Sequence, residues 1–322
     1  MSILITGAGG FIGQTLAAAL LLDTSISSLT LTDIVEPQIP TKHGNTTTRI
    51  HSVKADLTDK GTCETLFTSQ LTTVYLLHGL MSGAAEANLD LGLRVNIDST
   101  RFILDVLREV KPGIRVVFPS SLAVFGPSEG KLVTETTMSS PGSSYGAEKL
   151  ICEILLNDFS RRGLIDGRIL RLPTIIVRPG APSGAASSFC SGIIREPLKG
   201  EKSILPVSRD LKLWVCSTRT IIKNLVYAKD IPASMFGVGS RVVNLPGATV
   251  TVDQMLQVLG DVGGQKALSM IEEKKDPAVE GIVTKWPAQF DTSLAKALGF
   301  HDDGSLARTV HEYLQDYGNP TA

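Results

Sequence analysis

The chain has 322 residues, 31 basic and 32 acidic, and a formal net charge of -1. At the level of the whole chain this balance excludes the basic footprint of a protein that binds nucleic acid or an anionic membrane. Four scattered cysteines, with no CxxC or Cys/His cluster, predict neither a metal site nor a disulfide framework. The length suits one large α/β domain with a smaller lobe.

The N-terminal residues run directly into an apolar strand, without a basic region and a cleavable apolar stretch before it. No segment approaches the 18 or so apolar residues of a membrane span. We therefore expect a cytoplasmic protein without a membrane partner.

A strand, a glycine turn and a helix follow one another at this end of the chain. Ser2 to Thr6 reads as a short buried strand, and the sequence GAGGFIG that follows opens the amphipathic segment Gln14 to Leu20. Gly7 permits the tight turn, Gly10 lets the backbone approach a pyrophosphate, and Gly13 allows the helix to pack on the strand. Phe11 and Ile12 lie at the helix N-terminus, which offers free N–H groups to phosphate.

The next apolar run, Leu29 to Thr32, ends in Asp33. A carboxylate there can accept hydrogen bonds from both adenosine ribose hydroxyls and would repel a 2′-phosphate, which favours NAD over NADP. The alternative is an ordinary cap or loop acid. A third strand, His51 to Ala55, ends in Asp56 and Leu57, which we expect to line the adenine pocket.

A fourth strand, Val74 to Leu77, ends at His78 and Gly79. We expect His78 to be a hydrogen-bonded spacer beside the cofactor and not a catalytic base. Asn96 to Val110 has helical periodicity, and Ile114 to Phe118 is a strand.

Ser120 and Ser121 follow that last strand, at the carboxyl end where such sheets bind ligands. Further along, Tyr145 and Lys149 share one helix face because they are four residues apart. We expect the Lys149 ammonium to stabilise the phenolate and to lower the pKa of Tyr145, which makes this tyrosine a candidate base.

The motifs TGAGGFIG, FPSSLAVFG and YGAEK, with Asp33 and Asn96, together resemble the extended short-chain dehydrogenase/reductase family over nearly the whole chain. The resemblance implies an α/β fold, with a Rossmann-type doubly wound parallel sheet and a smaller C-terminal substrate lobe. It also implies the cofactor NAD. By position, the catalytic residues it implies are Ser121, with Ser120 as runner-up, Tyr145, Lys149 and Asn96.

A narrower resemblance comes from the stretch between Asn157 and Glu201, which is similar to the D-erythronate dehydrogenase group. Arg219 stands where the wider family has an aspartate, and a guanidinium can clamp a carboxylate with two hydrogen bonds. A surface salt bridge is the alternative for this arginine. The loop Ala181 to Ser188 suits either a cover over a polyol or a flexible connector. The expected substrate-binding residues are Ser120, Ser121, Thr174, Ser188 and Arg219.

The expected cofactor-binding residues are Gly7, Gly10, Phe11, Ile12, Asp33, Asp56, Leu57, Gly79, Tyr145, Lys149 and Pro173. Pro173 belongs to a predicted sixth strand, Leu170 to Val177, and is placed near the nicotinamide by the resemblance. We expect residues 1–177 to form the NAD-binding domain, with 219–247 returning to it. Residues 178–218 and 248–322 would form the substrate lobe.

The predicted activity is NAD-dependent oxidation of the C2 hydroxyl of a short sugar acid such as D-erythronate. A nucleotide-sugar epimerase or dehydratase with a transient keto intermediate would use the same residues and remains an alternative. A dinucleotide sensor without chemistry is a third possibility, which the intact Tyr145 and Lys149 pair disfavours. The resemblance further implies a homodimer through the helices Asn96 to Val110 and Tyr145 to Arg161.

Overall fold

The computed structural model describes residues 1–41, 47–128, 130–236 and 239–318. Its central element is a seven-stranded sheet in the order β10-β6-β5-β4-β1-β2-β3, in which every neighbouring pair is parallel. The order reverses between β1 and β4, as in a Rossmann-type sheet, so the predicted fold class is confirmed. The strands are β1 (Ser2–Thr6), β2 (Ser28–Asp33), β3 (Arg49–Lys54), β4 (Thr73–Leu76), β5 (Ile114–Ser121), β6 (Ile165–Leu172) and β10 (Val242–Asn244).

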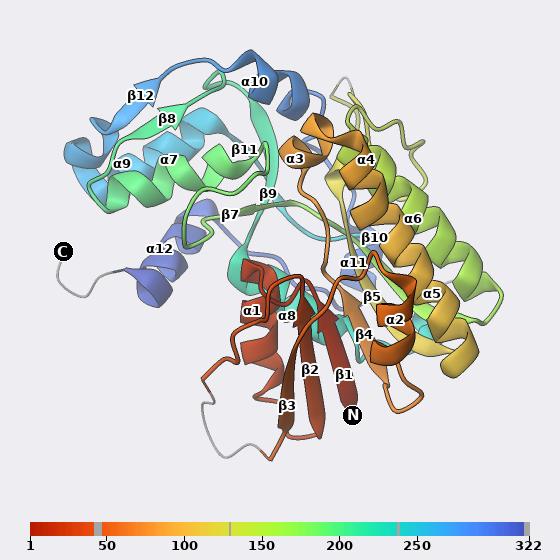
Figure 1. The fold of residues 1–322 in the computed structure, drawn as a ribbon. Coiled ribbons are helices and arrows are strands. Elements are labelled where there is room, and N and C mark those ends of the chain that lie inside the picture. The colour runs from red at the N-terminus through yellow and green to blue at the C-terminus, as the bar shows by residue number, and fades with distance from the viewer. Residues whose placement is uncertain (42–46, 129, 237–238, 319–322) are drawn as a thin grey trace.

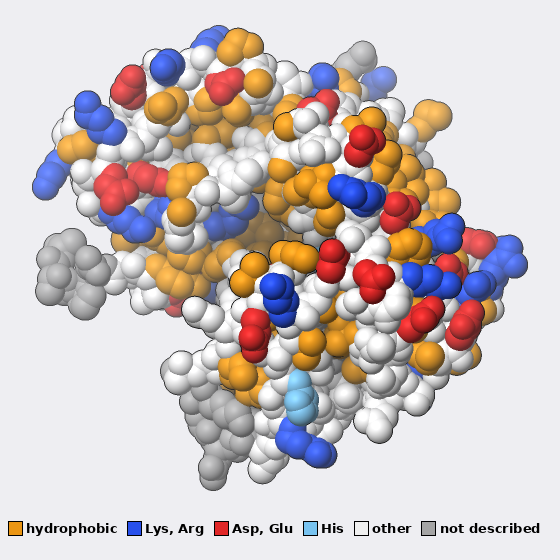
Figure 2. Space-filling view, in the orientation of Figure 1, with side chains coloured by type: hydrophobic (Ala, Val, Ile, Leu, Met, Phe, Trp, Pro, Cys, Tyr) orange, Lys and Arg blue, Asp and Glu red, His pale blue; other side chains and the backbone are white. Residues whose placement is uncertain are grey.

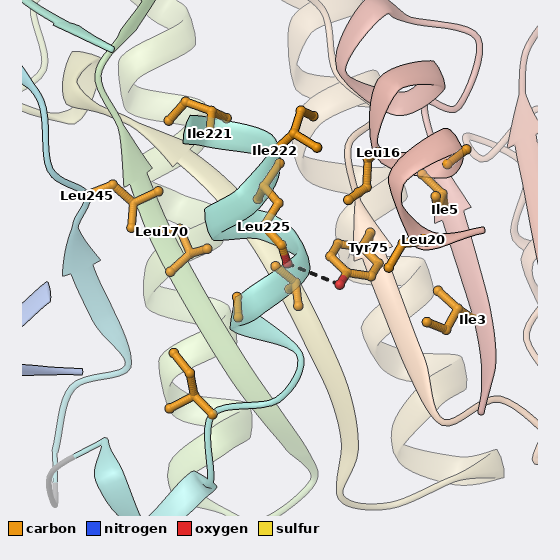
Figure 3. Packing of buried hydrophobic residues seen from close by; sticks show 14 of the residues in the cluster. Ile3, Ile5, Leu16, Leu20, Tyr75, Leu170, Ile221, Ile222, Leu225 and Leu245 are labelled. Carbon is orange, nitrogen blue, oxygen red and sulfur yellow. Dashed lines mark hydrogen bonds between the residues drawn. The ribbon is translucent and has the colours of Figure 1, made fainter. Parts of the chain in front are cut away.

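Helices cover both faces of this sheet (Figure 1). On one face lie α1 (Phe11–Leu20) and α8 (Thr218–Ala228); on the other lie α2 (Lys60–Leu66), α5 (Ser99–Val110) and α6 (Ser144–Arg161). Tyr75 of β4 is fully buried on the first face and donates its hydroxyl to the Leu225 carbonyl at 3.1 Å (Figure 3). This bond ties α8, which is 150 residues distant in sequence, to the centre of the sheet.

A second lobe lies beyond the carboxyl ends of the strands and has its own hydrophobic core (Figure 1). The lobe contains a three-stranded sheet and a strand pair: β7 (Thr174–Ile176), β9 (Lys212–Ser217) and β11 (Ala248–Thr251), then β8 (Ser203–Leu205) with β12 (Ile271–Glu273). Its helices are α7 (Ser188–Leu198), α9 (Val252–Leu268), α10 (Pro277–Val283) and α12 (Leu306–Tyr317). The molecule is hollowed between this second lobe and the sheet (Figure 2).

The predicted strand Leu170 to Val177 is divided in the structure. Residues up to Leu172 pair with β5 in the large sheet, whereas β7 begins at Thr174 and pairs with β9 in the second lobe. Pro173 lies at the break because proline has no N–H to donate to a sheet ladder. The chain therefore crosses from the sheet to the second lobe at Pro173, which puts this residue at the junction.

The helix predicted from Asn96 begins earlier and is irregular. A π-helical turn, η1 (Leu93–Asp98), precedes α5, and two short helices that the sequence did not reveal, α3 (Ser82–Ala87) and α4 (Leu89–Gly92), precede η1. Asn88 caps α4 by accepting from Leu91 N at 3.0 Å. The remaining elements are η2 (Leu122–Val124), η3 (Ala233–Met235) and α11 (Ser293–Ala297).

Candidate active site

A cavity of about 720 Å³ lies between the carboxyl ends of the sheet strands and the second lobe. Most of the residues predicted for the site line this one cavity. They are Gly7, Gly10, Phe11, Ile12, Asp33, Asp56, Leu57, Gly79, Ser120, Ser121, Tyr145, Lys149, Pro173 and Thr174. Three others, Asn96, Ser188 and Arg219, are not among its lining residues.

The glycine turn closes one end of the cavity. Gly7 has a φ of +63°, and a Cβ there would lie 2.5 Å from the backbone nitrogen of His78. A Cβ on Gly13 would lie 2.5 Å from the Gly7 carbonyl oxygen, so the close packing of α1 on the turn requires a glycine there. At Gly10 the nearest atom to such a Cβ is 3.3 Å away, and the N-terminus of α1 has no side-chain cap. The turn thus leaves space and free N–H groups at the helix N-terminus.

Asp33 lies at the end of β2, beside this turn. Its Oδ2 accepts from Gly9 N at 2.9 Å and its Oδ1 accepts from Ile34 N at 2.7 Å. Each carboxylate oxygen has a further lone pair, so these two bonds position the group without exhausting its capacity as an acceptor.

The two serines at the end of β5 have different partners. Ser120 is buried and its hydroxyl donates to Glu153 Oε1 at 2.5 Å. Ser121 Oγ accepts from Ala123 N at 3.1 Å, which leaves its hydroxyl hydrogen available to the cavity. The structure therefore favours Ser121 over Ser120 as a hydrogen-bond donor to a substrate.

Glu153 is in turn held by Arg171, whose Nη2 lies 2.6 Å from Oε2. Both side chains are buried, and the guanidinium also lies over the Phe125 ring, 4.6 Å from its centroid. This ion pair holds the end of β5 in place, because Ser120 at that end is bonded to its carboxylate.

Tyr145 and Lys149 lie on one face of α6 and both line the cavity. The ammonium of Lys149 lies 5.8 Å from the centroid of the Tyr145 ring and donates to the Pro119 carbonyl at 3.0 Å. Burial, and then the carboxylate of Glu148, raise the pKa of Tyr145 above its usual value. Burial lowers the pKa of Lys149 to about 8.

The expected lowering of the pKa of Tyr145 is therefore not what the chain's own groups produce. Removal of the phenol from water outweighs the attraction of an ammonium that is directed toward a carbonyl of β5. Tyr145 and Lys149 are placed as predicted, but the pKa of Tyr145 is raised and not lowered.

Asn96 is buried in η1, behind the segment that follows β4. Its Oδ1 accepts from Leu80 N at 2.7 Å, and its Nδ2 donates to the Leu80 carbonyl at 3.1 Å and to the buried carboxylate of Glu148. A Cβ on Gly79 would lie 3.1 Å from Asn96 Oδ1. Asn96 thus holds the cavity wall in position, and its amide faces the protein and not the cavity.

His78 has the geometry of the expected spacer. Its Nδ1 lies 2.7 Å from Thr6 Oγ1, and its Nε2 lies 2.8 Å from Ser99 Oγ. Burial, and then the charge of Lys149, lower its pKa to about 3. The imidazole is neutral and joins β1, the loop after β4 and α5.

The loop of residues 181–187 covers the cavity from the second lobe and is fixed to α3. Gly83 N donates to the Gly184 carbonyl at 3.1 Å, and Ala186 N donates to Ser82 Oγ at 3.0 Å. Ser188, the first residue of α7, accepts from Ser183 N at 2.9 Å and is not among the lining residues, so the structure does not bring this predicted substrate-binding residue into the cavity. The lining serines of this loop are Ser183 and Ser187.

Arg219 lies away from the cavity, at the start of α8. Its Nε donates to Asp316 Oδ2 at 2.7 Å, and its side chain is 43% exposed. Because its fork is already occupied by a carboxylate of α12, the structure supports the salt bridge and not the substrate clamp.

Sequence reasoning did not select Arg178, which lines the cavity two residues after β7, nor Ser82 and Trp286, which also line it. The signal for Arg178 was its place immediately after an apolar strand, where α/β sheets bind ligands. Ser82 and Trp286 come from parts of the chain that have no such signal.

Three further observations concern ions, cysteines and membranes. Among the described residues, no group of three or more His, Cys, Asp or Glu side chains is placed to hold a metal ion. All four cysteines are free and buried. Within the same residues, no helix has the length and apolar character that a membrane crossing needs.

A model of the NAD dependent epimerase/dehydratase family matches residues 3–241. The chain is 42% identical to a D-erythronate dehydrogenase of Cupriavidus necator over 99% of both chains. It is 38% identical to a D-erythronate dehydrogenase of Haemophilus influenzae, over 98% of this chain and 99% of the relative. A crystal structure described as the nucleoside-diphosphate-sugar epimerase of Agrobacterium tumefaciens is similar, with a TM-score of 0.91 and 34% identity over 98% of this chain and 94% of that one.

Proposed function

Because the chain belongs to the NAD dependent epimerase/dehydratase family and is an NAD-dependent dehydrogenase of the extended short-chain type, we propose that it oxidises a short sugar acid. The proposed reaction converts the C2 hydroxyl of an acid such as D-erythronate to the 2-oxo acid. Its main support is that Ser121, Tyr145 and Lys149 line one cavity whose other end is formed by the glycine turn and Asp33.

The residues at that end fit a dinucleotide. Gly10 and the uncapped N-terminus of α1 would receive the pyrophosphate, and Asp33 would accept from the adenosine ribose hydroxyls. The charge of Asp33 disfavours a 2′-phosphate, which supports NAD over NADP. Asp56 and Leu57 would border the adenine, and Pro173 the carboxamide.

Tyr145 acts as the base in this proposal. It takes the proton from the C2 hydroxyl as the C2–H bond breaks and the carbonyl forms, while Ser121 donates a hydrogen bond to the same oxygen. When bound, oxidised NAD would supply the acceptor for the hydride and its two electrons, and a positive charge that favours the phenolate. Lys149 would hold the nicotinamide ribose and stabilise the phenolate, and the Asn96 amide keeps the adjacent wall in position.

An epimerase or dehydratase reaction is the second candidate. The similarity to a structure described as a nucleoside-diphosphate-sugar epimerase favours it, and the same three side chains would serve. The two candidates differ in their net chemistry, because a dehydrogenase accumulates NADH whereas an epimerase returns the hydride to its substrate.

We also propose a homodimer in the cytoplasm. Two exposed hydrophobic side chains, Ile151 and Ile154, lie on α6, one of the two helices expected at the interface, and two more, Leu89 and Leu93, lie just before the other, in α4 and η1. Four free, buried cysteines suit a reducing compartment. Sedimentation of the purified protein tests the dimer.

The proposed function is tested by incubating the purified protein with NAD and a panel of four- and five-carbon aldonates beside nucleotide sugars, while NADH is followed by absorbance. NADH should accumulate with at least one aldonate and with no nucleotide sugar. If no aldonate gives NADH, the sugar-acid assignment is wrong; conversion of a nucleotide sugar without net NADH would establish the epimerase.

A further inference from the structure

Arg178 is a cation that lines the cavity and has no partner within the described part of the chain. It lies two residues beyond the end of β7, and its guanidinium forms no hydrogen bond or ion pair with the described residues. Its Nε is buried and unbonded among the described residues. The residue as a whole is half-buried, and an unpaired charge that is partly removed from water is costly, so such a group indicates a counter-ion from outside the chain.

Three other arginines with little exposed surface, unlike Arg178, form ion pairs with carboxylates of the protein. Arg168 lies 2.6 Å from Asp166, and Arg171 lies 2.6 Å from Glu153. Arg195 forms an ion pair with its neighbour Glu196. Each of these three guanidiniums has one buried nitrogen without a partner, as Arg178 has, but each is paired with a carboxylate of the protein, and that pairing distinguishes them from Arg178.

The backbone of Arg178 is held firmly even though its side chain is unbonded. Its N–H donates to Ser191 Oγ at 3.0 Å, and its carbonyl accepts from Arg195 Nη1 at 2.6 Å. Both partners belong to α7, which packs Phe189 and Ile193 into the hydrophobic core of the second lobe. The fold therefore fixes where the side chain starts, while the guanidinium itself is left without a bond to the described residues.

The groups around Arg178 do not neutralise it. The nearby charge of Arg195 repels it, and burial raises the pKa of the neighbouring Cys190 thiol to about 12, which keeps that thiol neutral. Burial itself lowers the pKa of Arg178 from its ordinary value, since the charged form is the one that loses water.

We propose that Arg178 binds the carboxylate of the substrate and is the residue that selects acids over neutral polyols. The planar fork of a guanidinium matches a carboxylate with two parallel hydrogen bonds. This inference rests on the proposed function: a 2-hydroxy acid held by its carboxylate presents, one bond away, the carbon on which Tyr145 and Ser121 act. Arg178 thus takes the role that the sequence had suggested for Arg219.

The test compares Arg178→Gln, Arg178→Lys and, as a matched control, Arg219→Gln. In Arg178→Gln the KM for the aldonate should rise by roughly 100-fold, as expected for loss of one partner of a buried charge pair. The KM for NAD and the rate measured with erythritol, a polyol without the carboxylate, should stay within about two-fold of wild type. Arg178→Lys retains the charge without the fork and should be intermediate.

Two results would overturn the inference. One is an unchanged KM for the aldonate in Arg178→Gln; the other is a rise in KM for Arg219→Gln in its place. Retained binding of NAD by each variant shows that it is folded.

A binding measurement separates failure of this inference from failure of the proposed function. The acid 3,4-dihydroxybutanoate has a carboxylate but no C2 hydroxyl, so it tests recognition without turnover. It should protect the wild-type complex with NADH against thermal unfolding, and the protection should be lost in Arg178→Gln even if no aldonate is oxidised. Protection by UDP that depends on Arg178, with none by the acid, would show that the anion is a nucleotide diphosphate and would overturn the carboxylate assignment.

Discussion

The hydroxyl of Ser120 donates to the buried carboxylate of Glu153 at 2.5 Å, whereas the adjacent Ser121, which lines the same cavity, makes no such bond. Adjacent residues of a strand point to opposite faces. Here Ser120 faces the ion pair of Glu153 with Arg171, and Ser121 is the proposed hydrogen-bond donor to the substrate.

Replacement of each serine by alanine should therefore have a different effect. Ser121→Ala removes the donor to the developing carbonyl oxygen, and kcat should fall by roughly 100-fold with the affinity for NAD retained. Ser120→Ala leaves a buried carboxylate with one partner fewer, and the free energy of unfolding should fall by about 1 to 3 kcal/mol with kcat little changed. Steady-state kinetics and denaturant unfolding of both variants test this, and the reverse pattern would assign catalysis to Ser120.

Tyr145→Phe tests the proposed base. The phenyl ring preserves the packing on α6 but has no group to accept the proton, so turnover should fall by a factor on the order of 1,000 or more. Binding of NADH, measured by fluorescence, should be retained. Activity that survives the substitution would exclude Tyr145 as the base.

Asp33→Asn tests the preference for NAD. The amide keeps the size of the side chain and an acceptor for Gly9 N but loses the charge. We expect kcat/KM with NAD to fall by roughly 10-fold and the ratio of NAD to NADP activity to fall with it. An unchanged ratio would mean that Asp33 does not exclude the 2′-phosphate.

His78 should make the protein sensitive to mild acid. Its pKa is lowered from 6.5 to about 3 in the fold, so between these values the unfolded chain binds a proton that the folded chain does not. Above pH ~6.5 this difference in protonation does not affect the free energy of unfolding. Below pH ~6.5 it lowers the free energy of unfolding, by about 2 kcal/mol between pH ~7 and pH ~5.

Denaturant unfolding at these two pH values tests the expectation. Between pH ~7 and pH ~5 the free energy of unfolding of His78→Gln should fall by about 2 kcal/mol less than that of wild type. The same substitution at His51, which is exposed on β3, controls for the loss of a histidine as such. Equal acid sensitivity of wild type and His78→Gln would contradict the assignment.

Gly83→Ala tests whether the loop of residues 181–187 shapes the substrate site. A Cβ at Gly83 would lie 2.7 Å from the Gly184 carbonyl oxygen, a backbone atom, so the loop must move away. The KM for the substrate should rise by roughly 10-fold with NAD binding unchanged. The control is Gly281→Ala in α10, where a Cβ meets nothing within 4 Å; a similar rise in that variant would show that the effect is not local.

Much of the fold and part of the site could be predicted from the sequence because they depend on local patterns. The glycine turn, the carboxylate at the end of β2 and the Tyr145 and Lys149 spacing each belong to a single element or to one strand with its turn. The steric requirement at Gly13 arises within the turn itself, where a Cβ would meet Gly7 and Ala8, so a motif is sufficient to identify it.

The functional difference between chemically similar side chains was decided only by the tertiary structure. Ser120 is distinguished from Ser121 by Glu153, 33 residues away, and Arg219 is paired with Asp316, 97 residues away. Arg178 lacks such a partner within the described chain and faces the cavity instead. Whether a serine or an arginine is free to meet a ligand depends on what distant elements place against it, and no local spacing contains that information.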